Sequence, residues 1–153
     1  MEKSDFRAIV NQAIETGIQG VSLKRTIEGV IQNFMEEVDC ALSAKIKKEI
    51  THVKEASRVL DDGSSSLFGS LAPGKIIEFA YDIFIVAKGD TKMPRKKFKL
   101  FSYEYNPTRT LPLVLRYNDA TVVCPDEGKL ANGLGGMLTT RAVSLIEWCQ
   151  NNI

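Results

Sequence analysis

The segment 77-IEFAYDIFIV-86 decides the expected fold. Because successive side chains of a strand point to opposite faces, its alternation predicts one long strand with an apolar face and a mixed face. The apolar set is Ile77, Phe79, Tyr81, Ile83 and Ile85, and the mixed set is Glu78, Ala80, Asp82, Phe84 and Val86. A strand of this length requires partner strands in a sheet.

Three more strands are predicted after this one, at about residues 97–105, 111–117 and 121–124. The turns between them, at residues 106–108 and 118–119, are short and contain proline, asparagine and aspartate, as tight turns do. Consecutive strands with short connections predict a four-stranded antiparallel meander.

Two helices are predicted before the sheet. Ser4 is a suitable cap for a first helix that ends at Gly17, and Ser22 caps a much longer second helix that extends to about Leu60. Apolar residues recur every three or four positions along both, with charged residues between them, which is the pattern of an amphipathic helix. A helix of about 35 residues is long for one domain. We therefore expect either a break near Ser43 or an interface at the far end.

The C-terminal part is predicted to be helical again and to pack on the sheet. Pro125-Asp126-Glu127 suits a helix start, and Thr139 or Thr140 can cap a last helix. The glycines of 133-GLGG-136 lack the lysine and hydroxyl that follow the last glycine of a phosphate loop. We interpret them as small residues that let the helix approach the sheet closely or bend.

These elements together predict an α+β fold in one domain over residues 1–153. The helical part covers residues 1–60, the antiparallel sheet residues 75–124 and the C-terminal helices residues 126–151. Exposed turns are expected at 61-DDGSSS-66 and 72-APG-74.

The composition is that of an ordinary globular protein, with 44% hydrophobic and 25% charged residues and a net charge of +1. A charge near zero argues against broad attraction to nucleic acid or anionic membrane. The first residues do not resemble a secretory signal, and no apolar run is long enough to span a bilayer. We therefore expect a cytoplasmic protein without membrane contact. Its three cysteines, Cys40, Cys124 and Cys149, are expected to be buried free thiols.

Few residues suggest catalysis. His52 is the only histidine, and the segment Glu49-Ile-Thr-His52 matches half of a di-iron helix motif. A complete site of that kind needs a second such pair, which this chain lacks. We therefore predict no catalytic residue, no metal and no cofactor, and we interpret His52 as a surface residue of the long helix.

One charge anomaly stands out, because residues 88–99 carry six basic residues and one acidic residue. Basic side chains beside exposed aromatics can bind single-stranded nucleic acid by phosphate pairing and base stacking. The same pattern is typical of a solvated hairpin tip whose lysines protect an edge strand, or of a dock for an acidic protein. The candidate partner-binding residues are Lys92, Arg95, Lys96, Lys97, Lys99, Tyr103 and Tyr105.

A second candidate site lies on the long predicted strand. Glu78 and Asp82 share one face, four residues apart, and Tyr81 lies between them in sequence. Carboxylates on a largely apolar strand can line a ligand pocket beside a sheet. A solvent-exposed face accounts for them equally well.

The missing chemistry, small size and uneven charge favour a non-catalytic cytoplasmic protein that binds another protein. Concrete forms are a bacterial inhibitor or immunity-like protein, or an accessory protein of a mobile element. The alternatives are nucleic-acid binding through the basic 88–99 hairpin, and a small-ligand binder or enzyme that uses the Glu78–Asp82 pocket. The long helix can also form a homodimer by burying a second apolar stripe that contains Ile31, Met35 and Leu42.

Overall fold

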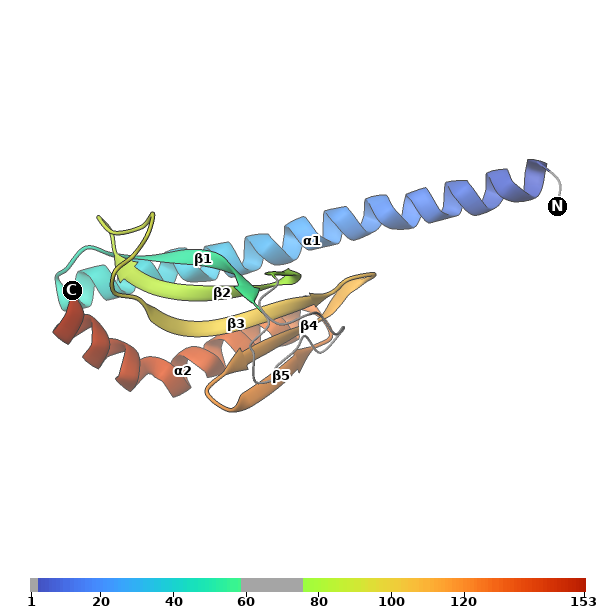
Figure 1. Ribbon diagram of the computed structural model, residues 1–153. Coiled ribbons are helices and arrows are strands. Elements are labelled where there is room, and N and C mark those ends of the chain that lie inside the picture. Colours follow the sequence, from blue (N-terminus) through green and yellow to red (C-terminus); the bar gives the residue numbers. More distant parts are fainter. Residues whose placement is uncertain (1–2, 59–75) are drawn as a thin grey trace.

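The structure, a computed structural model, describes the backbone of residues 3–58 and 76–153 and the side chains of residues 5–57 and 79–153 (Figure 1). The turns expected at 61–66 and 72–74 lie outside the described residues. The elements in chain order are α1 (Lys3–Ile46), β1 (Ile50–Arg58), β2 (Ile76–Ala87), β3 (Phe98–Asn106), β4 (Thr110–Tyr117), β5 (Ala120–Cys124) and α2 (Glu127–Asn152). The α+β class is therefore confirmed.

The two N-terminal helices predicted from the sequence are a single helix. α1 is 44 residues long and passes through Gly17 without a break. The prediction of a stop at Gly17 was wrong because a helix ends at glycine only when the chain also turns there. One glycine inside a helix costs about 1 kcal/mol, which continued amphipathic spacing on both sides can offset.

The predicted long helix also ends earlier than expected, at Ile46, and residues 50–58 form strand β1. Lys47 adopts a positive φ of 61°, and the Ile50 N–H donates to the Ser43 hydroxyl at 3.1 Å, so the chain reverses close to the suspected break. The spacing of Ile46 and Ile50 fits a helix, but residues 50–58 form a strand because they pair with β2. Glu49 and His52 therefore do not share a helix.

The sheet is an antiparallel meander in the order β1-β2-β3-β4-β5. The predicted antiparallel meander is confirmed. It has five strands instead of the predicted four, because β1 was not predicted. β2 lies between β1 and β3, with Ile85 opposite His52 on one side and Phe98 on the other. The predicted alternation of the 77–86 strand is present, since Ile83 and Ile85 face the core.

The C-terminal part is one helix. The Asp126 side chain accepts the Lys129 N–H at 2.8 Å and caps α2, as predicted. Thr139 and Thr140 do not start a new helix, because their hydroxyls donate to the carbonyls of Gly135 and Gly136 one turn back, at 3.0 and 2.9 Å. Such bonds let a threonine remain within a continuous helix.

Both helices pack against one face of the sheet (Figure 1). α1 contributes Ile27, Ile31, Met35, Val38 and Leu42 to the core, and α2 contributes Leu130, Leu134, Met137, Leu145 and Cys149. The sequence-based proposal that Ile31, Met35 and Leu42 form a spare dimer stripe is wrong. Those three side chains are at most 6% exposed because they cover the chain's own sheet.

The glycines of α2 differ in their surroundings. A Cβ added at Gly133 would lie 3.0 Å from Leu115 Cδ1 and 3.4 Å from Cys124 Sγ, so this glycine permits close helix–sheet packing. A Cβ at Gly135 or Gly136 would meet no described atom within 4 Å. The expected close approach is thus carried by one of the three glycines.

This difference gives a matched pair of variants. Gly135→Ala should raise the free energy of unfolding by about 0.5–1 kcal/mol, because alanine is the better helix former and its methyl group meets open space. Gly133→Ala should lose that gain, because its methyl group crowds Leu115 in the core. Urea denaturation compares the two, and equal stabilisation by both would contradict the close packing at Gly133.

Candidate interaction site

The N-terminal half of α1 extends past the end of the sheet (Figure 1). We call residues 5–21 the arm. At 1.5 Å per residue a 44-residue helix is about 66 Å long, whereas the longest strand, 12 residues in β2, spans about 40 Å. A helix this much longer than its sheet has to project beyond it.

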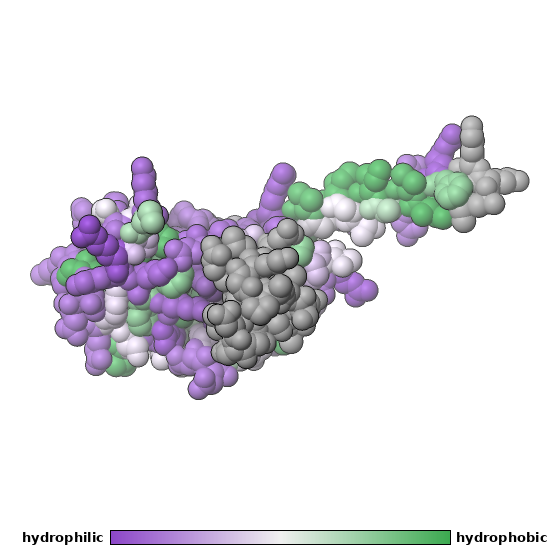
Figure 2. All heavy atoms as spheres, viewed as in Figure 1, coloured by the Kyte–Doolittle hydropathy of each residue, from purple (hydrophilic) through white to green (hydrophobic). Residues whose placement is uncertain are grey.

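The arm carries a stripe of large apolar side chains that face solvent. They are 49–59% exposed, and Figure 2 shows them as a green band along the projecting helix. The stripe consists of Phe6, Ile9, Val10, Ile14, Ile18 and Val21. Single exposed apolar residues are common, but a contiguous row of this size is a candidate interaction site.

Phe6, Ile9 and Val10 of the stripe continue the buried face of the same helix. Steps of three or four residues lead from Phe6 through Val10, Ala13, Gly17 and Gly20 toward the core residues that follow. Beyond Gly20, whose carbonyl accepts the Thr110 hydroxyl of β4 at 3.4 Å, the same face is covered by the sheet. One continuous apolar face is therefore covered along its C-terminal half and exposed along the arm.

The sequence did predict an amphipathic helix from Ser4 to Gly17, but not that its apolar side chains face solvent. The missing signal was the continuity of α1, because a short separate helix could have folded back onto the sheet. The helix length and the strand lengths together would have revealed the projecting arm.

The basic hairpin is only partly free. Lys97 pairs with Glu55 at 2.9 Å and lies over the Phe84 ring, and Lys99 lies 3.6 Å from Asp82. Lys92, Arg95 and Lys96 are exposed, and no ion pair involves them in the described part of the chain. Two of the five predicted cations thus hold the sheet together, and three remain available at the hairpin tip.

The two tyrosines grouped with this hairpin lie elsewhere. Tyr103 and Tyr105 are at most 2% exposed and belong to the core between the sheet and α1. The structure therefore separates the basic side chains from the aromatics. Bases could not stack on these rings without opening the core.

The residues of the predicted pocket are also separated. Tyr81 and Asp82 are neighbours on β2, so their side chains lie on opposite faces. Tyr81 packs on the helix side against Tyr103 and Tyr105, with ring centroids 5.5 and 6.4 Å away. Glu78 lies on β2, but its side chain is outside the described residues.

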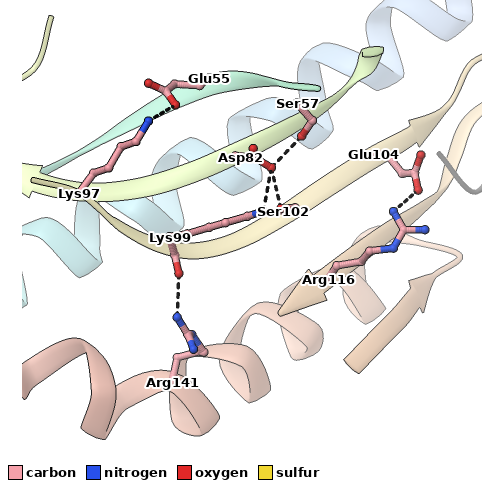
Figure 3. A network of polar contacts seen from close by, with 9 residues as sticks. All are labelled: Glu55, Ser57, Asp82, Lys97, Lys99, Ser102, Glu104, Arg116 and Arg141. Atoms are coloured by element: carbon pink, nitrogen blue, oxygen red, sulfur yellow. Dashed lines mark hydrogen bonds and ion pairs between the residues drawn. The ribbon is translucent and has the colours of Figure 1, made fainter. Parts of the chain in front are cut away.

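Asp82 is the centre of a polar network on the face that points away from the helices (Figure 3). Its Oδ1 accepts the hydroxyls of Ser57 and Ser102, both at 2.7 Å, and these serines come from β1 and β3. Nearby, the buried Glu104 pairs with Arg116 of β4. These contacts link neighbouring strands, so the Asp82 carboxylate is used in joining the sheet.

Another polar cluster fixes α1 onto the sheet. The Tyr103 hydroxyl donates to Glu28 of α1 at 3.1 Å, and Lys54 of β1 pairs with the same carboxylate at 3.4 Å. Burial, and then the negative charge of Glu28, raise the pKa of Tyr81, Tyr103 and Tyr105 above the ordinary 10.0. The cluster lies within the covered part of α1, so it helps to hold that part of the helix on the sheet.

The raised pKa values predict alkaline destabilisation. Unfolded tyrosines ionise near pH about 10, while Tyr103 and Tyr105 stay protonated in the folded state, so stability should hold below that pH and fall above it. The loss should approach about 1.4 kcal/mol per pH unit for each such tyrosine. Urea denaturation between about pH 8 and pH 11 measures it. A Tyr103→Phe variant should show a shallower decline, and an unchanged slope would contradict the assignment.

His52 is not the surface helix residue that was predicted. Its Nδ1 lies 2.7 Å from Asp39 Oδ2, and both side chains are at most 15% exposed, so the pair joins β1 to α1. Among the residues that the structure describes, no three His, Cys, Asp or Glu side chains gather closely enough to hold a metal ion.

The cysteines are free, and two of the three are buried as predicted. Burial raises the pKa of the Cys124 and Cys149 thiols, which keeps them protonated and unreactive near neutral pH. Cys40 is exposed on α1, contrary to the prediction. A small side chain is tolerated there because the core of this helix segment is formed by other positions.

Comparisons of the chain with protein-family models, with curated proteins and with solved structures found no match. Over the described part of the chain, neither helix combines the length and the apolar content needed to cross a bilayer. The arm is therefore the feature from which a function has to be inferred.

Proposed function

We propose that this chain is a protein-interaction protein that binds its partner through the apolar stripe of the arm. The observation that supports this is the row of six half-exposed apolar side chains on a helix that projects past its own sheet. A helix with one apolar stripe is suited to bind an apolar groove or another helix.

The size of the stripe supports a protein partner. A large apolar side chain offers on the order of 200 Å², so six half-exposed ones present roughly 600 Å². Burying that area at about 25 cal/mol per Å² provides about 15 kcal/mol before the costs of association. The stripe is therefore sufficient for a specific complex.

The charge of the arm indicates the partner's chemistry. Residues 5–21 contain Asp5, Arg7 and Glu15 as their only charged residues. Helices that lie on anionic membranes carry many Lys and Arg residues on the polar face, and this arm has one. An apolar protein surface therefore fits the arm better than a lipid surface does.

The inhibitor or immunity-like form of the proposal is compatible with this geometry. A rigid projecting helix can occupy a groove on a partner and block it, while the sheet domain stays outside. A bacterial cytoplasmic protein or an accessory protein of a mobile element would use the arm in the same way.

Nucleic-acid binding through the basic hairpin is the second candidate. It is favoured by the exposed, unpaired Lys92, Arg95 and Lys96 at the hairpin tip in the described structure. Because Tyr103 and Tyr105 are buried, such binding would rest on phosphate contacts alone. It would then be weak, strongly salt-dependent and insensitive to sequence.

Pulldown with the full chain distinguishes the two candidates. Ile14→Asp should abolish capture of the partner, whereas Gln12→Asp, which adds the same charge on the polar side of the arm, should leave capture unchanged. Both positions are exposed, so stability should change by less than about 0.5 kcal/mol. Equal capture by Ile14→Asp and the wild type would contradict the proposal. Nucleic acid lost on Lys96→Glu would favour the hairpin instead.

A further inference from the structure

We infer that the arm binds a second copy of this chain, with the two arms side by side and antiparallel about a two-fold axis near Ala13. The inference rests on the proposed function, because it names the partner of the same stripe. It is argued from the direction of the stripe, the position of the sheet, the two glycines of the arm and the area available.

The position of the sheet selects the antiparallel direction. Helical spacing places Phe6, Val10, Ala13, Gly17 and Gly20 on the same side of α1 as the core residues, and α1 is straight in Figure 1. A parallel partner helix on that stripe would continue into the space that the first chain's sheet occupies. An antiparallel partner runs outward past the tip of the arm, so each sheet domain lies beyond the other arm's N-terminal end.

The length of the arm gives the register. Full overlap of two antiparallel arms over residues 5–21 places Ala13 near the two-fold axis, at the midpoint of this range. Phe6 then lies opposite Gly20 of the second copy, and Ile9 lies opposite Gly17. Large side chains therefore meet the positions with no side chain, as close helix packing requires.

The glycines support this contact independently of the stripe. A Cβ at Gly17 or Gly20 would meet no described atom within 4 Å, so the packing of a single chain does not call for glycine there. Glycine within a helix is less favourable than alanine. A second helix that crosses close to Gly17 and Gly20 gives these residues a packing role.

The area and the charges fit self-association. Two stripes of roughly 600 Å² bury about 1,200 Å² in total, which is the lower end for a specific interface. We therefore expect a dissociation constant in the range of about 1–100 µM. No charged residue lies among the six stripe residues, and antiparallel helices align their dipoles favourably.

Sedimentation equilibrium of the full chain is the first test. The wild type should be a reversible dimer, and Ile9→Glu should raise the dissociation constant at least about thirtyfold, because the two-fold axis buries two unpaired carboxylates. Gln12→Glu adds the same charge on the polar side and should change the constant less than about twofold. Wild-type monomer at about 100 µM would overturn the inference.

The glycines provide a second matched pair. Gly17→Ala should weaken the dimer at least about fivefold, because the methyl group pushes the helices apart. Gly29→Ala should leave the dimer unchanged, since Gly29 lies two residues after Ile27 and therefore on the other side of α1. Circular dichroism should show equal or higher helix content in both variants. Tighter association of Gly17→Ala would contradict the close contact.

Disulfide cross-linking tests the direction, in a Cys40→Ser background. A mixture of Phe6→Cys and Gly20→Cys chains should form mainly the mixed disulfide, because facing Cα atoms come within about 7 Å only in the antiparallel arrangement. Predominant Phe6→Cys homodimers would overturn it.

These outcomes separate this inference from the proposed function. A chain that stays monomeric but captures a different protein through Ile14 would overturn self-association and leave the proposed function standing. A monomer whose arm variants all behave like the wild type, in both sedimentation and pulldown, would overturn both.

Discussion

The apolar face of helix α1 is longer than the sheet that it covers, and the rest of the structure depends on this difference in length. Its C-terminal half supplies five core residues, from Ile27 to Leu42, and covers the sheet together with α2. Its N-terminal half has the same chemistry, but none of the strands that the structure describes lies beneath it. The same periodicity therefore stabilises the domain at one end of the helix and leaves an exposed apolar surface at the other.

The polar contacts of the molecule are mostly internal. Asp82 joins three strands through Ser57 and Ser102, and Glu28 and Asp39 of α1 bind groups on the sheet. These contacts hold α1 in one orientation, so the arm projects as a rigid extension of the domain. The stripe is thus presented in one direction, which favours the antiparallel pairing that we infer.

Local pattern predicted most of the elements, and long-range contacts decided the rest. The 77–86 strand, the meander after it and the Asp126 cap were predictable because alternation, tight turns and capping act between near neighbours. Strand β1 was not predictable in this way, because the spacing of Ile46 and Ile50 fits a helix. Only the pairing of residues 50–58 with β2 makes that segment a strand. The projecting arm was not predicted because an apolar stripe looks the same whether or not a sheet lies beneath it. The hairpin cations were found, but the burial of Tyr103 and Tyr105 depends on the position of α1.

Amide hydrogen exchange in the arm, measured at about 1 µM and about 100 µM chain, tests the central claim most directly. The account predicts slower exchange for residues 5–21 at the high concentration than at the low one, with exchange of residues 27–42 unchanged between the two. Exchange in the arm that does not change with concentration would contradict it.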